Sequence, residues 1–380
     1  MNSKILFILN SDFGVLNTIG ARAEHIANEL KDKSDLVVFC RDYNKPLAGD
    51  FNLIRVVPVG KFIMQVLTAI PIYITNKIPS NKIKIKIFEY FLLNKLKKLN
   101  LDEVNLIHSW DFLPNIYNFI KKNYPNIKIY QDVPIASPNI LKKLKNPELE
   151  FIGENFKPQT ELVNSLKFID NFIVPSNFVF DSLVELGISK QKINIIPFGV
   201  NIEKFKPILN KNLNSFNVAF SGNVNNRKGV KYLVQAWKEL NLKNANLNIY
   251  GRVYPEVLKY FKENKKFNIN LCGFVDIQRE LPKNELYVFP SLMEGSSKSV
   301  YEAMACSMPV ITTYNAGSII DDGKDGFIVP VQNIDLLKEK ILFFYDNRIE
   351  IEKFGTRAKN NVEKFTWNVY GKGIIEEYKK

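Results

Sequence analysis

Residues 289–305 read FPSLMEGSSKSVYEAMA, a stretch that predicts a strand, a tight turn and then a helix. A short apolar run ends at Phe289, small residues follow, and the helix is expected over residues 297–306. A helix N-terminus presents free backbone N–H groups and can therefore bind an anion. Glu294 and Glu302 flank this turn, with seven residues between them. In isolation the pattern fits either an anion site or an ordinary connection with a capping serine and a surface glutamate.

Strand-like apolar runs alternate with helical patterns along the chain, in two series. The first series has runs at residues 4–9, 35–40, 53–59, 105–108, 127–130, 171–174 and 193–196, and the second at 216–220, 247–250, 269–272, 286–289 and 310–312. Such alternation is typical of parallel sheets covered by helices. We therefore predict an α/β protein with two Rossmann-like doubly wound domains that face a central cleft. The domains are expected at residues 1–200 and 201–365, with a C-terminal helix at 366–380 that packs back toward the first domain.

The composition describes a globular protein with a strong positive charge. Its 380 residues are 46% hydrophobic and 24% charged, and the formal net charge is +13. This excess indicates an anionic partner, although compositional drift explains scattered lysines equally well. Nucleic acid is disfavoured because no basic motif is interleaved with aromatic residues. The sequence shows no signal-peptide pattern and no apolar run that could span a bilayer, which predicts a cytoplasmic protein.

Metal and disulfide chemistry are not expected. The three cysteines, Cys40, Cys272 and Cys306, lie far apart and form no Cys-x-x-Cys pair. His25 and His108 are the two histidines of the sequence, which is too few for a histidine-based metal centre. We predict that the protein uses no metal and no cofactor.

Residues 61–100 do not follow the alternation of strands and helices. Apolar clusters here are interleaved with lysines, among them Lys82, Lys84 and Lys86. Such a segment can lie on an anionic membrane surface, which predicts peripheral binding to the inner membrane face. It can also be a helical insert of the first domain, with its apolar face in the core.

A second Gly-containing loop follows the first strand of the second series. Residues 220–230 read FSGNVNNRKGV, where Gly222 permits close approach of a ligand and Arg227 and Lys228 supply two cations. The order of Gly and Lys differs from that of a Walker loop. A lone Lys-Gly at a turn is weak evidence. Together with the serine-rich turn at residues 289–305, however, it gives the second domain two elements that can face a phosphate.

Several motifs in order resemble retaining glycosyltransferases of family 4 (glycosyl transferases group 1), which have the GT-B fold. Residues 294–311 resemble the Glu-x7-Glu signature of that family and the Ala-Cys-Gly-Leu-Pro-Val-Ile motif that follows it. Further matches in kind and spacing lie at residues 20–25, 174–178, 196–201 and 316–330. The resemblance covers nearly the whole chain and is weakest from about residue 45 to 100. It implies an N-terminal acceptor-side domain and a C-terminal domain that binds the nucleotide sugar.

The resemblance also implies roles for individual residues. Lys228 would neutralise the donor diphosphate together with backbone N–H groups near Ser297 and Lys298. Glu302 would accept hydrogen bonds from the ribose hydroxyls, and Glu294 would touch the transferred sugar near the reacting carbon. The predicted catalytic residues are Glu294 and His108, and the predicted donor-binding residues are Gly20, Arg22, Gly222, Asn223, Arg227, Lys228, Ser296, Ser297, Lys298 and Glu302.

The first domain would contribute His108 and the loop at Gly20 and Arg22. The resemblance implies that His108 faces the donor sugar, whereas the sequence pattern by itself fits a core histidine. Gly20 and Arg22 would close over the donor phosphates. One departure concerns Asn223, which stands where the family often has an arginine; Arg227 could supply the missing cation.

The predicted function is transfer of a hexose, with retention and without a metal, from a UDP- or GDP-linked sugar to a hydroxyl acceptor. Surface polysaccharide or glycolipid synthesis is the expected setting. Two alternatives stay open: a catalytically silent GT-B scaffold that partners an active transferase, motivated by Asn223, and a nucleotide-sugar 2-epimerase. The sequence identifies neither the donor sugar nor the acceptor.

Overall fold

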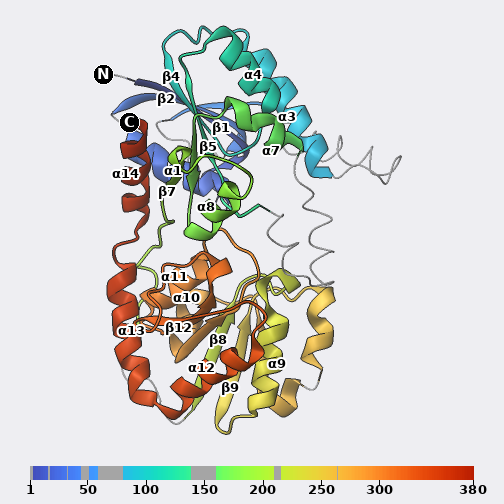
Figure 1. Cartoon of the computed structure of the whole chain (residues 1–380), viewed down its shortest axis with the longest axis vertical. Helices are drawn as coiled ribbons and strands as arrows, with labels where there is room; N and C mark the ends of the chain where they lie inside the picture. Colours follow the sequence, from blue (N-terminus) through green and yellow to red (C-terminus); the bar gives the residue numbers. More distant parts are fainter. Residues whose placement is uncertain are drawn as a thin grey trace.

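The computed structural model describes residues 3–15, 18–31, 33–43, 51–58, 80–137, 160–208, 215–262 and 264–380. These residues form two parallel α/β units that follow one another along the long axis of the molecule (Figure 1). The prediction of two Rossmann-like doubly wound domains is confirmed. Residues 61–79 lie outside the described residues. They belong to the segment 61–100, which is predicted either to bind a membrane surface or to form a helical insert of the first domain.

The first unit contains a seven-stranded parallel sheet in the order β3-β2-β1-β4-β5-β6-β7. Its strands are β1 (Ser3–Phe13), β2 (Ser34–Tyr43), β3 (Asn52–Arg55), β4 (Val104–Ser109), β5 (Lys128–Asp132), β6 (Asn171–Val174) and β7 (Ile193–Ile195). Its helices are α1 (Ile19–Leu30), α3 (Ser80–Leu96), α4 (Pro114–Asn123), α7 (Thr160–Ser165) and α8 (Asn177–Val184), with 3₁₀ turns η1 (Leu166–Phe168) and η2 (Lys190–Lys192). Because helices cover both faces, the apolar run of β1 is buried throughout its centre, as its sequence predicts.

The second unit contains a six-stranded parallel sheet in the order β10-β9-β8-β11-β12-β13. Its strands are β8 (Phe216–Ser221), β9 (Ala245–Tyr250), β10 (Ile269–Gly273), β11 (Leu286–Phe289), β12 (Val310–Thr313) and β13 (Gly326–Val329). Its helices are α9 (Val230–Leu240), α10 (Ile277–Glu280), α11 (Lys298–Ala305), α12 (Ile334–Asp346) and α13 (Arg348–Val362), with 3₁₀ turns η3 (Asn226–Lys228), η4 (Pro255–Phe261), η5 (Asn264–Phe267), η6 (Leu281–Lys283) and η7 (Tyr314–Ala316). Strand β13 was not among the strands predicted from the sequence.

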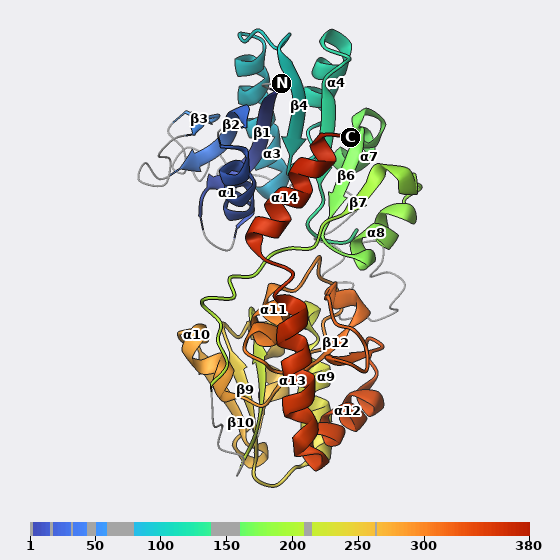
Figure 2. The same ribbon diagram turned by 90° about the vertical axis from the view of Figure 1, so that its left-hand side faces the viewer.

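Helix α14 (Trp367–Tyr378) returns from the second unit to the first and packs on α1 (Figure 2). The ring of His25 stacks on Trp367 with the ring centroids 4.5 Å apart, and Tyr370 of α14 is buried. The chain therefore crosses between the two units twice, before β8 and after α13. The domain boundaries drawn at residues 200 and 365 stay predictions.

The two units touch beside the loop that precedes α11. The Ser176 hydroxyl at the start of α8 donates a hydrogen bond of 2.5 Å to the carbonyl of Gly295. Nearby, the Tyr314 hydroxyl donates to the Asp181 carboxylate at 2.6 Å. A Cβ at Gly295 would lie 1.6 Å from the Pro134 carbonyl oxygen, so this contact requires glycine. The loop that carries Glu294 is thus held between the two units.

Candidate functional site

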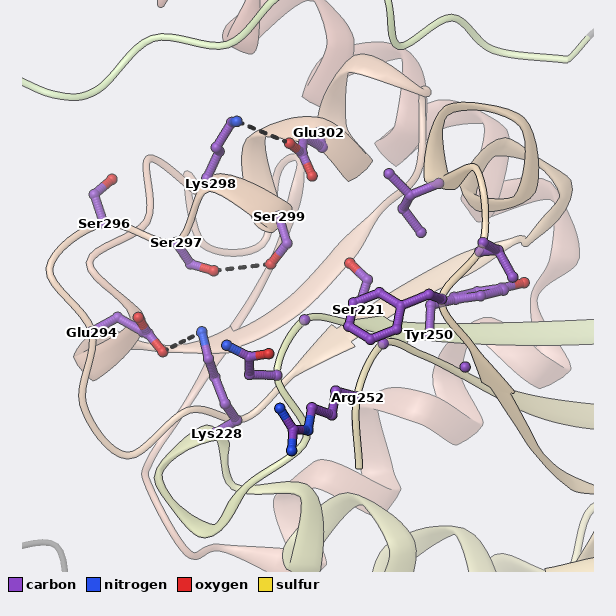
Figure 3. Close-up of a pocket in the computed structure, with 17 residues that line it drawn as sticks. Ser221, Lys228, Tyr250, Arg252, Glu294, Ser296, Ser297, Lys298, Ser299 and Glu302 are labelled. Atoms are coloured by element: carbon purple, nitrogen blue, oxygen red, sulfur yellow. Dashed lines mark hydrogen bonds and ion pairs between the residues drawn. The ribbon is translucent and has the colours of Figure 1, made fainter. Parts of the chain in front are cut away.

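A cavity of about 500 Å³ opens at the carboxyl ends of β8, β9, β10 and β11 in the second unit (Figure 3). This is the edge where open parallel sheets bind ligands. Eight residues predicted from the sequence line this cavity: Gly222, Asn223, Lys228, Glu294, Ser296, Ser297, Lys298 and Glu302. Two loops that are far apart in the sequence, the second of which leads into α11, therefore meet at one site.

The loop from β8 to α9 is shaped by two glycines and one asparagine. Gly222 has φ of +130° and Gly229 has φ of +69°, a region that favours glycine. A Cβ at Gly229 would lie 1.9 Å from the carbonyl oxygen of Pro290, so this loop packs tightly against the end of β11. The Asn225 side chain accepts a hydrogen bond from the Lys228 N–H at 3.2 Å. Together these contacts turn the Lys228 side chain into the cavity.

Glu294 lies between two cations. Its Oε1 atom is 2.6 Å from Nζ of Lys228 and 2.8 Å from Nη1 of Arg227. Burial raises the pKa of Glu294, but the two cations outweigh burial and hold this pKa below its ordinary value. Burial also lowers the pKa of Lys228, and Glu294 opposes that effect. The carboxylate is therefore ionised at neutral pH and fixes both cations.

Arg227 joins the two loops and does not line the cavity. Its Nη1 atom donates to the Met293 carbonyl at 2.5 Å, in addition to its contact with Glu294. Its own carbonyl accepts from the Leu292 N–H at 2.9 Å. With its guanidinium engaged in this way, Arg227 is poorly placed to act for the arginine that Asn223 replaces, and donor binding by Arg227 stays a prediction.

The pKa of Glu302 shifts in the opposite direction to that of Glu294. Glu302 lies on α11 with 13% of its side chain exposed, and Nζ of Lys298 is 3.8 Å away. Burial raises the pKa of Glu302 to about 7, although Lys298 lowers it. This carboxyl group therefore titrates near neutral pH, unlike Glu294.

The start of α11 carries three serines. The hydroxyls of Ser297 and Ser299 are 3.1 Å apart, and the Ser296 hydroxyl donates to the Tyr301 hydroxyl at 2.8 Å. The backbone N–H of Ser297 donates to the Ala316 carbonyl at 3.0 Å, so this amide is already used within the protein. A ligand at this helix end would have to use the following amides.

The predicted residues of the first unit are not part of the cavity. Arg22 is buried and its Nη1 atom lies 3.0 Å from Oδ1 of Asp132, with the guanidinium over the Phe198 ring. Gly20 packs where a Cβ would lie 1.8 Å from the Asp12 carbonyl oxygen. These contacts explain both residues as structural, and donor binding by them stays a prediction.

His108 is fully buried and is not brought together with Lys228 or Glu294. Its Nδ1 atom lies 2.5 Å from the Tyr378 hydroxyl, and its ring stacks on Trp110 with the centroids 4.1 Å apart. Burial lowers the pKa of His108, while Asp132 opposes this shift. These contacts favour the core histidine that the pattern by itself suggested. A catalytic role for His108 stays a prediction that this geometry does not favour.

The sequence pattern did not indicate the cavity residues at the ends of β9 and β10. Tyr250, the last residue of β9, lines the cavity together with Gly251, Arg252, Phe274 and Val275. Phe274 is 83% exposed, which is unusual for a large apolar side chain. The available signal was their position directly after predicted strands, because those strand ends meet at one edge of a parallel sheet.

Within the described part of the chain, no cluster of His, Cys, Asp and Glu could hold a metal ion. The predicted absence of a cofactor stays a prediction.

Residues 215–347 match the family model described as Glycosyl transferases group 1. Over 216 residues the chain is 30% identical to an uncharacterized glycosyltransferase of Methanocaldococcus jannaschii, covering 56% of this chain and 60% of that protein. Over 187 residues it is 28% identical to the UDP-Gal:alpha-D-GlcNAc-diphosphoundecaprenol alpha-1,3-galactosyltransferase of Escherichia coli, covering 43% of this chain and 48% of that protein. The chain thus matches between 48% and 60% of the length of these relatives.

The crystal structure of Anabaena HepE in complex with UDP and glucose has a similar architecture. Its TM-score is 0.67 at 15% sequence identity, and the superposition covers 100% of both chains. At this identity the similarity shows the fold alone. That fold is GT-B, as the motifs predict.

Proposed function

We propose that this protein is a glycosyltransferase of the group 1 type, which moves a hexose from a nucleotide-diphosphate sugar to a hydroxyl acceptor. The proposal proceeds from the family match of residues 215–347. One observation carries it: Lys228, Glu294 and Glu302 line a single cavity at the carboxyl ends of a parallel sheet. The cavity combines a cation for phosphate with carboxylates for hydroxyl groups.

The charges of the site suit departure of a diphosphate. Negative charge develops on the leaving diphosphate, and fixed cations stabilise it without reorganisation at the moment of reaction. Lys228 is held by Glu294 at 2.6 Å and would not need to move far. Glu302 would accept hydrogen bonds from the ribose hydroxyls, and Glu294 would contact the transferred sugar. Retention and metal independence rest on the resemblance to family 4 and are part of the proposal.

A donor screen tests the proposal against its two alternatives. Wild-type protein would be incubated with UDP- and GDP-hexoses, and the products measured by mass spectrometry. We expect slow hydrolysis of one donor without an acceptor, and no hydrolysis by Glu294→Gln. If no donor shifts the melting temperature and none is consumed, the protein is a catalytically silent scaffold and not an enzyme. If the released or bound sugar is the 2-epimer, the protein is a nucleotide-sugar 2-epimerase and not a transferase.

The acceptor is proposed to be a surface glycan or a lipid-linked sugar. The name of the Escherichia coli relative gives its acceptor as a diphosphoundecaprenol-linked sugar. No helix among the described residues of this chain is long and apolar enough to cross a membrane. Access to such an acceptor would then require peripheral contact of the protein with the membrane surface, and the lysines of α3 are candidates for this contact.

A further inference from the structure

The cations that face the proposed diphosphate are partly neutralised before any ligand binds. Lys228 and Arg227 share one carboxylate oxygen of Glu294, at 2.6 and 2.8 Å. These three groups together carry one net positive charge. Lys298 pairs with Glu302 at 3.8 Å. The diphosphate of a nucleotide sugar carries one negative charge on each phosphate, so these groups leave part of its charge unbalanced.

Arg252 supplies a further cation at the same cavity. It is exposed, it lines the cavity, and no acidic side chain among the described residues pairs with it. Its guanidinium lies over the Tyr254 ring, with a distance of 5.2 Å from the guanidinium carbon to the ring centroid. Figure 3 shows the guanidinium directed toward the side of the cavity that Lys228 occupies.

The backbone of Arg252 is fixed to the phosphate-facing loop. Its carbonyl accepts from the Val224 N–H at 2.8 Å, and the Gly222 N–H donates to the Tyr250 carbonyl at 3.0 Å. Gly251 has φ of +119°, and a Cβ there would lie 2.1 Å from the Gly222 carbonyl oxygen. Only glycine allows this approach, which places the end of β9 directly against the loop of Gly222. Arg252 therefore enters the site from a defined position.

We propose that Arg252 binds the diphosphate of the donor and takes the place of the arginine that is absent at Asn223. This inference rests on the proposed function and adds a residue that the sequence motifs do not include. A guanidinium is a permanent cation, and its N–H groups donate charge-assisted hydrogen bonds to phosphate oxygens. Its free charge and fixed backbone distinguish it from Arg227, which joins the two loops.

Binding of UDP, GDP, uridine and guanosine tests this role. Calorimetry on wild type, Arg252→Gln and Arg252→Lys would be compared with Lys266→Gln, which removes an exposed charge of the same domain outside the cavity. We expect Arg252→Gln to weaken binding of the preferred diphosphate by about tenfold and to leave nucleoside binding within about twofold. Arg252→Lys should stay within about threefold of wild type, and Lys266→Gln should match wild type.

The outcomes separate this inference from the proposed function. Equal losses for Arg252→Gln and Arg252→Lys would show that charge is not the cause and would overturn the role of Arg252. That role is also overturned if Arg252→Gln binds the diphosphate like wild type, or loses nucleoside and diphosphate alike. In each of these cases wild type still binds nucleotide, so the proposed function stands. If wild type binds neither diphosphate, both fail.

Discussion

At the residue scale, Glu294 and Glu302 differ because of what surrounds each carboxylate. Lys228 and Arg227 hold the pKa of Glu294 below its ordinary value in spite of burial. Glu302 is half-buried and has one more distant cation, and desolvation raises its pKa to about 7. The two glutamates of one sequence motif are therefore expected to respond differently to pH.

Replacing Lys228 with glutamine should lower kcat for donor turnover by roughly 10²–10³, the usual effect of removing one group that stabilises developing charge. Glu294 keeps its contact with Arg227, so the two loops should stay joined. Steady-state kinetics with the donor found in the screen would measure the change. Lys266→Gln is the control for loss of one positive charge. A kcat for Lys228→Gln within about threefold of wild type would contradict the proposed role.

Glu302 should make the ligand-free protein less stable as pH rises. Its pKa is raised by folding, so the folded state favours the protonated group, and stability present below pH 4.5 is lost as pH rises to about 7. This pKa shift of Glu302 corresponds to roughly 3 kcal/mol of the free energy of unfolding. Glu302→Gln should therefore unfold at higher urea than wild type at pH 8 and at similar urea at pH 4.5. If the urea midpoints of Glu302→Gln and wild type differed by the same amount at pH 8 and at pH 4.5, the raised pKa of Glu302 would be contradicted.

Nucleotide affinity should change with pH in the opposite direction. The ionised Glu302 accepts hydrogen bonds from ribose hydroxyls better than the protonated group does. Binding of the preferred diphosphate should therefore weaken as pH falls from 8 to 6 in wild type. In Glu302→Gln it should be weaker throughout and depend less on pH. Calorimetry at both pH values measures this, and equal pH dependence in the two proteins would rule out Glu302 as the source.

At the element scale, the loop between β8 and α9 depends on Gly229. Alanine there meets both an unfavourable φ of +69° and the Pro290 carbonyl at 1.9 Å, whereas Gly323, with φ of +76°, has nothing within 4 Å of its Cβ position. Gly323→Ala should cost about 1–2 kcal/mol from the backbone conformation alone. Gly229→Ala should cost about 3 kcal/mol or more, because the clash adds to that cost. Urea unfolding compares the two, and equal losses would contradict the close packing.

Helix α3 bears on the two interpretations of residues 61–100. Its Phe88, Leu92 and Leu96 are fully buried, which identifies this part as a helix with its apolar face in the core. Lys84 is half-buried and Lys86 is exposed, so charge remains available at the surface. The described part of α3 therefore supports the interpretation of this segment as a helical insert of the first domain. Binding of α3 to a membrane surface stays a prediction.

Replacing Lys82, Lys84 and Lys86 with glutamine should weaken binding to anionic liposomes. Each lysine near such a surface contributes about 1 kcal/mol, so the triple variant should lose at least tenfold in partitioning. Sedimentation with phosphatidylglycerol vesicles measures this, and neutral vesicles serve as the control. Unchanged partitioning would reject membrane contact by this helix.

At the scale of the whole molecule, the contact between the two units lies beside Glu294. Gly295→Ala would place a Cβ 1.6 Å from the Pro134 carbonyl and should force the units apart. The cavity is lined by residues of the second unit, so nucleotide affinity should change by less than about threefold while kcat falls at least tenfold. Calorimetry and kinetics separate the two effects. Equal losses in both would show that the substitution disturbs the second unit itself.

The sequence by itself determined the class of the fold and most of the cavity. Continuous apolar runs such as that of β1 predict strands buried on both faces, and the alternation with helices predicts parallel sheets. The Gly222 loop and the residues 294–302 were identifiable because a glycine-containing turn between a strand and a helix is a local feature, made by neighbouring residues. For the same reason Lys228, Ser297 and Glu302 were found without the structure.

Only the tertiary structure decided which side chains meet. The burial of His108 under Tyr378 depends on α14 crossing back from the second unit, which no local pattern contains. The pairing of Arg227 with Glu294 and the free charge of Arg252 depend on distances between loops that are far apart in the sequence. Charge balance, burial and pKa are properties of the assembled surroundings, so the different environments of Glu294 and Glu302 became visible only in three dimensions.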